Sequence, residues 1–165
     1  MSDLTSSEKE FDVQAVKDRL LAYREAEREI DTQSEALERI RVRMEGIGAQ
    51  NITDMPKSPS GPTDRYSDLV SRKIEIEQMI GYDVEKQKQE RDYFEGILRK
   101  LKKADERAVI RFRYFHVLSW NEVTNAMFGA KVDYLDKEDS YLRRVTVLHG
   151  RALLHIAMCI AGEKL

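Results

Sequence analysis

The sequence of 165 residues has little of the material that several classes of protein require. It contains one cysteine, Cys159, which cannot form a disulfide within the chain, so the composition favours a reducing compartment. No apolar run approaches the roughly 20 residues that a membrane-spanning helix needs, and the acidic, polar N-terminus is unlike a secretory signal. We therefore expect a cytoplasmic protein with no membrane partner.

Motifs for catalysis and metal binding are also lacking. The histidines His116, His149 and His155 have no close ligand spacing with one another or with the cysteine, which argues against a structural zinc site. No serine or cysteine lies in a recognisable nucleophile motif, and there is no glycine-rich phosphate loop. The sequence therefore predicts no enzymatic activity, no catalytic or metal site and no cofactor.

Glycine and proline are scarce, with eight and three residues, whereas 35% of the residues are charged. Many charges and few helix breakers favour long solvated helices over a sandwich or a barrel. All three prolines fall between Pro56 and Pro62, which predicts a loop over residues 48–65. These features together predict an all-α fold with a long helix on each side of that loop.

A stripe of coiled-coil type runs along the segment before the loop. Apolar residues recur there at every seventh position, at Val16, Tyr23, Ile30, Leu37 and Met44. A second helix is expected from Asp64 or Ser67 to about Leu101, with a more diluted stripe. Two such helices predict an antiparallel hairpin, although the same stripe would also serve pairing between two chains.

The sequence becomes basic and aromatic after Leu101, and it predicts three short helices at residues 104–116, 119–128 and 139–161. Asp105 is expected to cap the first, Ser119 and Glu122 form a capping box for the second, and Gly129 is placed to end it. Three helices with an arginine-rich last one are typical of a helix-turn-helix. The predicted organisation is a disordered N-terminus over residues 1–9, a helical hairpin arm over 10–101 and a helix-turn-helix domain over 102–165.

The net charge of −2 conceals an asymmetry, because residues 1–96 carry −7 and residues 97–165 carry +5. A basic C-terminal portion favours nucleic acid as a partner. Six side chains on the final helix are suited to reach base edges and phosphates: Tyr141, Arg143, Arg144, Thr146, His149 and Arg151. The pattern alone leaves open that they only solvate the surface of a helical bundle.

Two stretches resemble the region-four helix-turn-helix of sigma factors. The first holds Tyr114, Ser119, Trp120, Glu122 and Val123, and the second holds Val145, Leu148, His149, Arg151, Ala152 and Leu153. The chain is thereby similar to phage-encoded sigma-like transcriptional regulators of the ArpU and RinA type, which control late phage genes in Gram-positive hosts. The resemblance implies binding of double-stranded promoter or operator DNA in the bacterial host cell. It also implies that the arm forms a homodimer or higher homo-oligomer, or contacts host RNA polymerase.

The sequence departs from this family between the last two helices, where about ten extra residues replace a short turn. The segment 130–139 contains Asp133, Asp136, Glu138 and Asp139, whose charges would oppose the approach of phosphates. The alternative interpretation is a coiled-coil adaptor that does not bind DNA specifically. The sequence leaves open the DNA target, activation or repression, the oligomeric state and the role of this segment.

Overall fold

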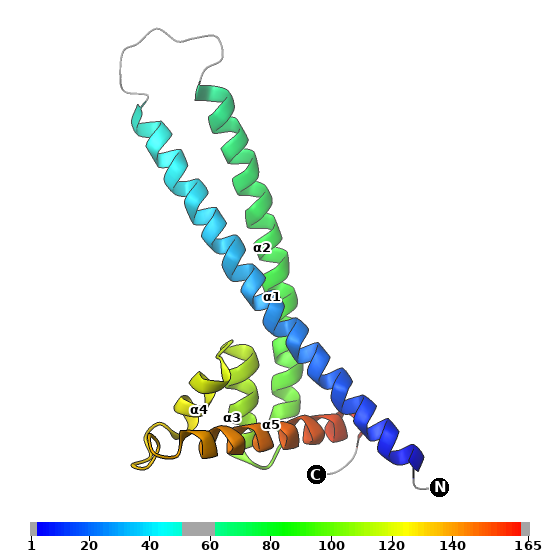
Figure 1. The fold of residues 1–165 in the computed structure, drawn as a ribbon. Coiled ribbons are helices and arrows are strands. Elements are labelled where there is room, and N and C mark those ends of the chain that lie inside the picture. The colour runs from blue at the N-terminus through cyan, green and yellow to red at the C-terminus, as the bar shows by residue number, and fades with distance from the viewer. Residues whose placement is uncertain (1–2, 51–61, 163–165) are drawn as a thin grey trace. The chain divides into compact units, whose positions relative to one another are not determined.

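The computed structural model describes residues 3–50 and 62–162 of the chain, and its side chains over residues 13–47 and 65–162. Six helical elements follow one another, and no strand occurs in these ranges (Figure 1): α1 (Asp3–Gln50), α2 (Pro62–Leu98), α3 (Ala104–Ile110), the π-helix η1 (Arg111–Phe115), α4 (Trp120–Phe128) and α5 (Glu138–Ile160). The expected all-α fold, beginning with two long helices, is confirmed. None of the helices described combines the length and the apolar character needed to cross a membrane.

The end of α1 and both ends of α2 lie within a few residues of the expected positions, whereas the start of α1 does not. α1 is traced from Asp3, within the segment for which the sequence predicts disorder, and it ends at Gln50. α2 begins at Pro62, which suits the first turn of a helix because proline has no amide hydrogen to lose there. Most of the predicted loop 48–65, namely residues 51–61, lies outside the described residues.

The chain divides into two compact units, one formed by Met1–Glu27 with Lys88–Leu165 and the other by Arg28–Gln87. This grouping differs from the expected arm and tail, because the first part of α1 and the last part of α2 belong with the three short helices. We refer to these as unit 1 and unit 2.

Unit 2 pairs the second part of α1 with the first part of α2 in antiparallel orientation. The side chain of Gln33 donates to Asp83 at 3.5 Å, and Arg41 donates to Glu77 at 3.2 Å. Leu37 and Ile40 of α1 are buried, whereas Val84 of α2 is 47% exposed. The pairing in this unit therefore combines a short apolar interface with polar contacts along its length.

Unit 1 contains the main hydrophobic core. Both long helices contribute to it through Val16, Leu20 and Phe94, which pack with side chains of all the shorter helices. On α5 the buried positions are spaced at helical intervals: Val145, Leu148, Ala152, Leu153 and Ile156. These buried residues form one face of α5, which continues without a break through Gly150.

The helix expected at 104–116 differs in detail from the one observed. Its N-cap is Lys103, and Asp105 lies in the first turn instead of at the cap. Its last five residues form η1, in which His116 closes the final turn with a bond from its amide to the carbonyl of Arg111 at 2.9 Å. A wider turn of this kind inserts one residue into the helix and shifts the faces of the side chains that follow.

Candidate nucleic-acid interface

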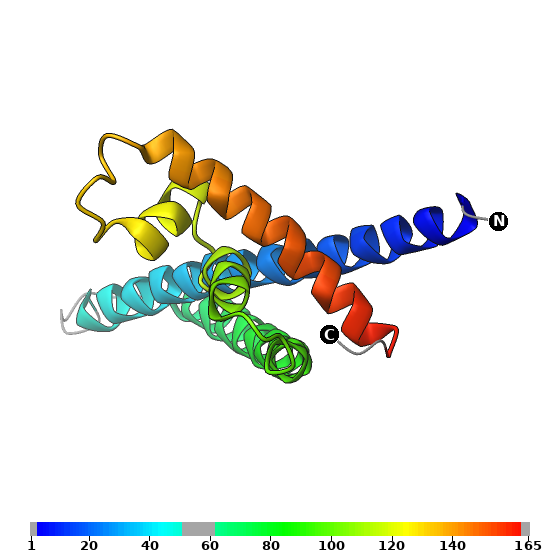
Figure 2. The same ribbon diagram turned by 90° about the horizontal axis from the view of Figure 1, so that it is seen from below.

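The packing of α4 against α5 determines which face of α5 is exposed. α4 begins with the capping box expected at Ser119 and Glu122, in which each residue's side chain accepts from the other's backbone amide. Val123 and Phe128 of α4 are buried with Val145 of α5 in one core cluster. α4 lies beside the first half of α5 (Figure 2), so one face of α5 is covered and the other remains exposed.

The exposed face of α5 carries three of its arginines. Arg143, Arg144 and Arg151 are all exposed, and Thr146 is exposed as well. No ion pair or hydrogen bond within the described residues engages Arg143 or Arg151. Positions four residues apart lie on one side of a helix, so Arg143 and Arg151 flank position 147 on the same face. That position is Val147, an exposed apolar residue whose side chain carries no hydrogen-bonding group.

Arg144 is held in place by an aromatic side chain. Its guanidinium lies 5.0 Å from the centre of the Phe128 ring, and that ring is stacked on Tyr141 with centroids 5.1 Å apart. The hydroxyl of Tyr141 in turn donates to Asp133 at 2.8 Å. Tyr141 is therefore half-buried and engaged in this arrangement, and its contribution is to support Arg144 more than to offer a free hydroxyl.

His149 faces the interior of the protein. Its side chain is 8% exposed, its Nε2 lies 2.8 Å from the hydroxyl of Tyr114, and Trp120 packs edge-on against its ring. Burial, with Lys17 and Arg113 nearby, lowers the pKa of His149 to about 4. The ring is neutral near pH 7 and does not reach the exposed face, so His149 does not belong with the arginines.

The turn between η1 and α4 is fixed by two arginines. Arg24 of α1 donates to the carbonyl of Val117 at 3.3 Å, and Arg113 donates to the carbonyl of Leu118 at 2.9 Å. Arg113 also lies over the Trp120 ring, 4.4 Å from its centre. Val117 adopts a φ of +57°, which is strained for a β-branched residue. The turn before α4 is thus held by one contact from η1 and one from the long helix α1.

The segment between α4 and α5 packs on the protein through one residue. Tyr134 is buried in the core cluster and its ring lies 5.8 Å from that of Tyr141. Asp133 accepts from Lys137 at 2.9 Å as well as from Tyr141, and these two bonds hold the pKa of its carboxyl below the ordinary range. One of the four acidic charges expected to repel phosphates is therefore partnered, and the segment between α4 and α5 consists mainly of turns.

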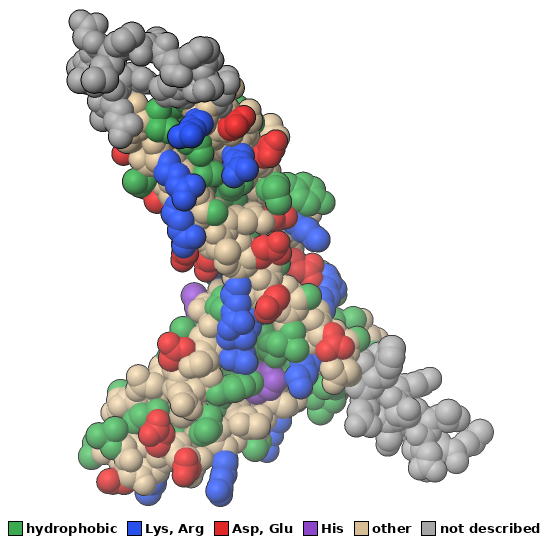
Figure 3. All heavy atoms as spheres, turned by 45° about the horizontal axis from the view of Figure 1, so that its top comes forward, with side chains coloured by type: hydrophobic (Ala, Val, Ile, Leu, Met, Phe, Trp, Pro, Cys, Tyr) green, Lys and Arg blue, Asp and Glu red, His purple; other side chains and the backbone are tan. Residues whose placement is uncertain are grey.

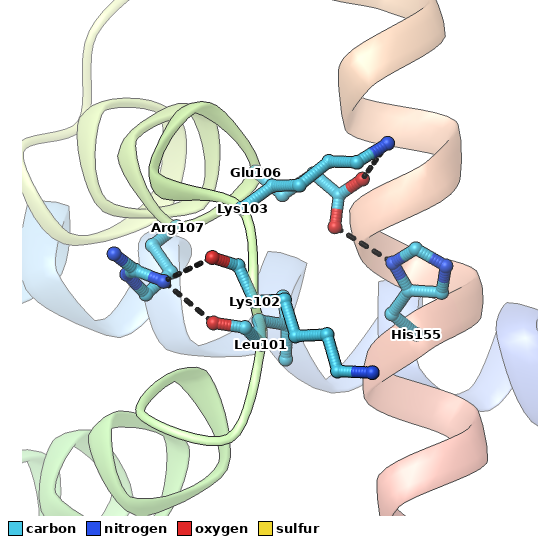
Figure 4. Close-up of polar contacts among 6 residues, drawn as sticks. All are labelled: Leu101, Lys102, Lys103, Glu106, Arg107 and His155. Atoms are coloured by element: carbon cyan, nitrogen blue, oxygen red, sulfur yellow. Dashed lines mark hydrogen bonds and ion pairs between the residues drawn. The ribbon is translucent and has the colours of Figure 1, made fainter. Parts of the chain in front are cut away.

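A buried carboxylate anchors the far half of α5 (Figure 4). Glu106 is 1% exposed, and its Oε2 lies 2.6 Å from Nδ1 of His155. Lys103 approaches its other oxygen at 3.9 Å. Arg107 turns the other way and donates to the carbonyls of Leu101 and Lys102 at 2.5 and 3.2 Å. These bonds tie the first turn of α3 to α5 and to the connection between α2 and α3.

Charges of both signs are mixed on one face of the molecule (Figure 3). On the described part of the face drawn in Figure 3, basic and acidic side chains alternate with hydrophobic ones, and no patch of one sign covers it. Within the described residues, no three His, Cys, Asp or Glu side chains gather as a metal site would require. Comparison with protein-family models, with curated proteins and with solved structures found no match.

Proposed function

We propose that the protein is a DNA-binding transcriptional regulator of phage or prophage origin, acting in the bacterial cytoplasm. α4 and α5 serve as the two helices of a sigma-like helix-turn-helix, and α5 enters the major groove of a promoter or operator. The observation that carries this proposal is the exposed face of α5, where Arg143, Arg144 and Arg151 project from a helix whose opposite face is buried. Arginine binds both phosphates and guanine edges. No catalysis is part of this function.

The helical arm makes the contacts with other protein chains. In this proposal it joins two copies into a homodimer or higher homo-oligomer, or binds host RNA polymerase. Unit 2 supports such a role because Ile74, Met79 and Tyr82 of α2 are large apolar side chains that remain exposed. Exposed apolar groups on a helical surface favour contact with another protein.

The test is fluorescence-anisotropy binding to fragments of the genome that surrounds the gene, at low and moderate salt, with a shuffled duplex as control. We expect tight binding to one fragment, with an affinity that falls with salt as counterions are released. The double variant Arg143→Ala with Arg144→Ala should weaken binding about tenfold or more and lower the salt slope by about 2.

The matched control is Arg39→Ala with Arg43→Ala, which removes the same charge from exposed positions of unit 2. This variant should bind the same fragment within about twofold of the unaltered protein, because it loses only general attraction. Circular dichroism should show both double variants folded. Normal affinity in the variant of α5 would remove Arg143 and Arg144 from the interface.

The second candidate function is that of a coiled-coil adaptor without sequence-specific DNA binding. The exposed apolar side chains of unit 2 and the mixed charges of Figure 3 favour it. Equal, weak binding to all fragments, lost as salt rises, would support this alternative. A pull-down against host polymerase and phage proteins would then identify the partner.

A further inference from the structure

One large apolar side chain stands among the arginines of α5. Val147 is 53% exposed, and arginines occupy the positions four and three residues before it and four residues after it. The other large apolar side chains exposed on α5 are Leu154 and Ile160, and neither has this surrounding. An apolar side chain with guanidinium groups on both sides of it along the helix suits a particular kind of ligand. Such a ligand offers a small apolar group with anionic oxygens on both sides.

DNA offers both kinds of group. Arg143 and Arg151 are eight residues apart, about 12 Å along the helix axis at 1.5 Å per residue. The major groove of DNA is about 12 Å wide, phosphates border it, and each thymine presents a C5-methyl group on its floor. A helix in the groove would place Val147 at the base edges while Arg143 and Arg151 reach toward phosphates.

Phe128 and Gly150 both favour close contact between this part of α5 and a ligand. Phe128 holds the guanidinium of Arg144 at 5.0 Å from its ring, so less side-chain freedom is lost when a ligand binds. Gly150 is exposed, and no atom lies within 4 Å of the place where a Cβ would stand. The backbone beside Val147 is therefore open to a closely approaching surface.

We propose that Val147 is a specificity-determining residue that reads the C5-methyl group of a thymine in the major groove. The proposal rests on the DNA-binding function proposed above and adds the base that is recognised. It also assigns the roles on this face, in which the arginines bind the backbone or guanine and Val147 distinguishes thymine from the other bases.

The experiment begins with selection of a duplex from a random-sequence library by the full-length protein. Each thymine of the selected duplex is then replaced in turn by uracil, which removes only the methyl group. We expect one replacement to weaken binding about three- to fivefold, the size expected for one methyl group withdrawn from an apolar contact. Val147→Ala should bind the thymine and uracil duplexes equally, and Leu154→Ala, the matched control on the same helix, should discriminate between them as the unaltered protein does.

Each other result would overturn the proposal in a distinguishable way. If a duplex is selected but no uracil replacement matters, or if Val147→Ala still discriminates, the role of Val147 is wrong while DNA binding stands. If no duplex is enriched, both the role and the proposed function are wrong. If the unaltered protein binds phosphatidylserine-containing vesicles, and Val147→Ala abolishes that binding but leaves DNA binding unchanged, the exposed valine serves a lipid surface and its role in reading thymine is wrong.

Discussion

The hydroxyl of Tyr114 on η1 and Nε2 of His149 on α5 lie 2.8 Å apart, and both side chains are buried. Burial raises the pKa of Tyr114 to about 12 and contributes most to lowering that of His149 to about 4. The pair therefore joins two helices through neutral groups near pH 7. Protonation of His149 would place a charge in the core beside Lys17 and Arg113.

This pair predicts a loss of stability in mild acid. His149 is harder to protonate in the folded protein than in the unfolded chain, so the unfolded chain binds more protons between about pH 6.5 and pH 4. The free energy of unfolding should fall as the pH falls through this range, by up to about 3 kcal/mol. Urea unfolding of the unaltered protein at a series of pH values measures this fall. His149→Gln, which stays neutral throughout, should show a flatter profile, and two parallel profiles would disprove the assignment.

The backbone conformation of Val117 predicts that two small substitutions, glycine and alanine, will show the reverse of their usual order of stability. Alanine is ordinarily the more stable residue, because glycine loses more backbone freedom on folding. At a φ of +57° the order should reverse, and Val117→Gly should be more stable than Val117→Ala by about 1 kcal/mol. Both variants remove the valine methyl groups, so their difference isolates the backbone strain. Thermal unfolding followed by circular dichroism measures it, and a more stable alanine variant would contradict the strain.

Substitution of glycine by alanine should have opposite effects on the free energy of unfolding at the end of α4 and in the middle of α5. A Cβ on Gly129 would lie 2.5 Å from the carbonyl oxygen of Asn125, so Gly129→Ala should lower the free energy of unfolding by about 1–3 kcal/mol. Gly150 has open space around it in mid-helix, so Gly150→Ala should raise that free energy by up to about 1 kcal/mol. Denaturant titration compares the two variants. A neutral Gly129→Ala would mean that the end of α4 shifts at little cost.

Two adjacent residues between α4 and α5 should differ in how far their substitution by alanine lowers the free energy of unfolding. Tyr134 is buried in the core cluster, so Tyr134→Ala should lower the free energy of unfolding by about 3 kcal/mol. Leu135 is 86% exposed, so Leu135→Ala should change it by less than about 0.5 kcal/mol. Equal costs, measured by the same titration, would show that the segment packs differently.

Features encoded by local pattern were predictable from the sequence. The long helices followed from periodicity and the absence of helix breakers, and the capping box at Ser119 and Glu122 followed from two residue types at a fixed spacing. The π-helix η1 and the strained Val117 were not predictable in this way. They depend on contacts with distant residues such as Arg24, which local sequence does not reveal.

The candidate interface was predictable only in part. Arg143, Arg144, Thr146 and Arg151 lie on the exposed side of α5 as expected, whereas His149 points inward. A signal was present, because His149 lies four residues from both Val145 and Leu153, which are core positions. The chemical type of a residue alone does not separate the buried His149 from the exposed arginines, and it does not reveal the exposed Val147; helical spacing does.

The composition of unit 1 from Met1–Glu27 and Lys88–Leu165 has a consequence for how the chain folds. Contacts such as that of Arg19 with Glu90 must close a long stretch of intervening chain, which costs entropy and slows folding. The antiparallel pairing within unit 2 brings residues 28 and 87 toward each other and so shortens the effective length of this loop. On the ribosome Val16 and Leu20 emerge well before the residues that bury them, so the core of unit 1 completes only after synthesis is nearly finished.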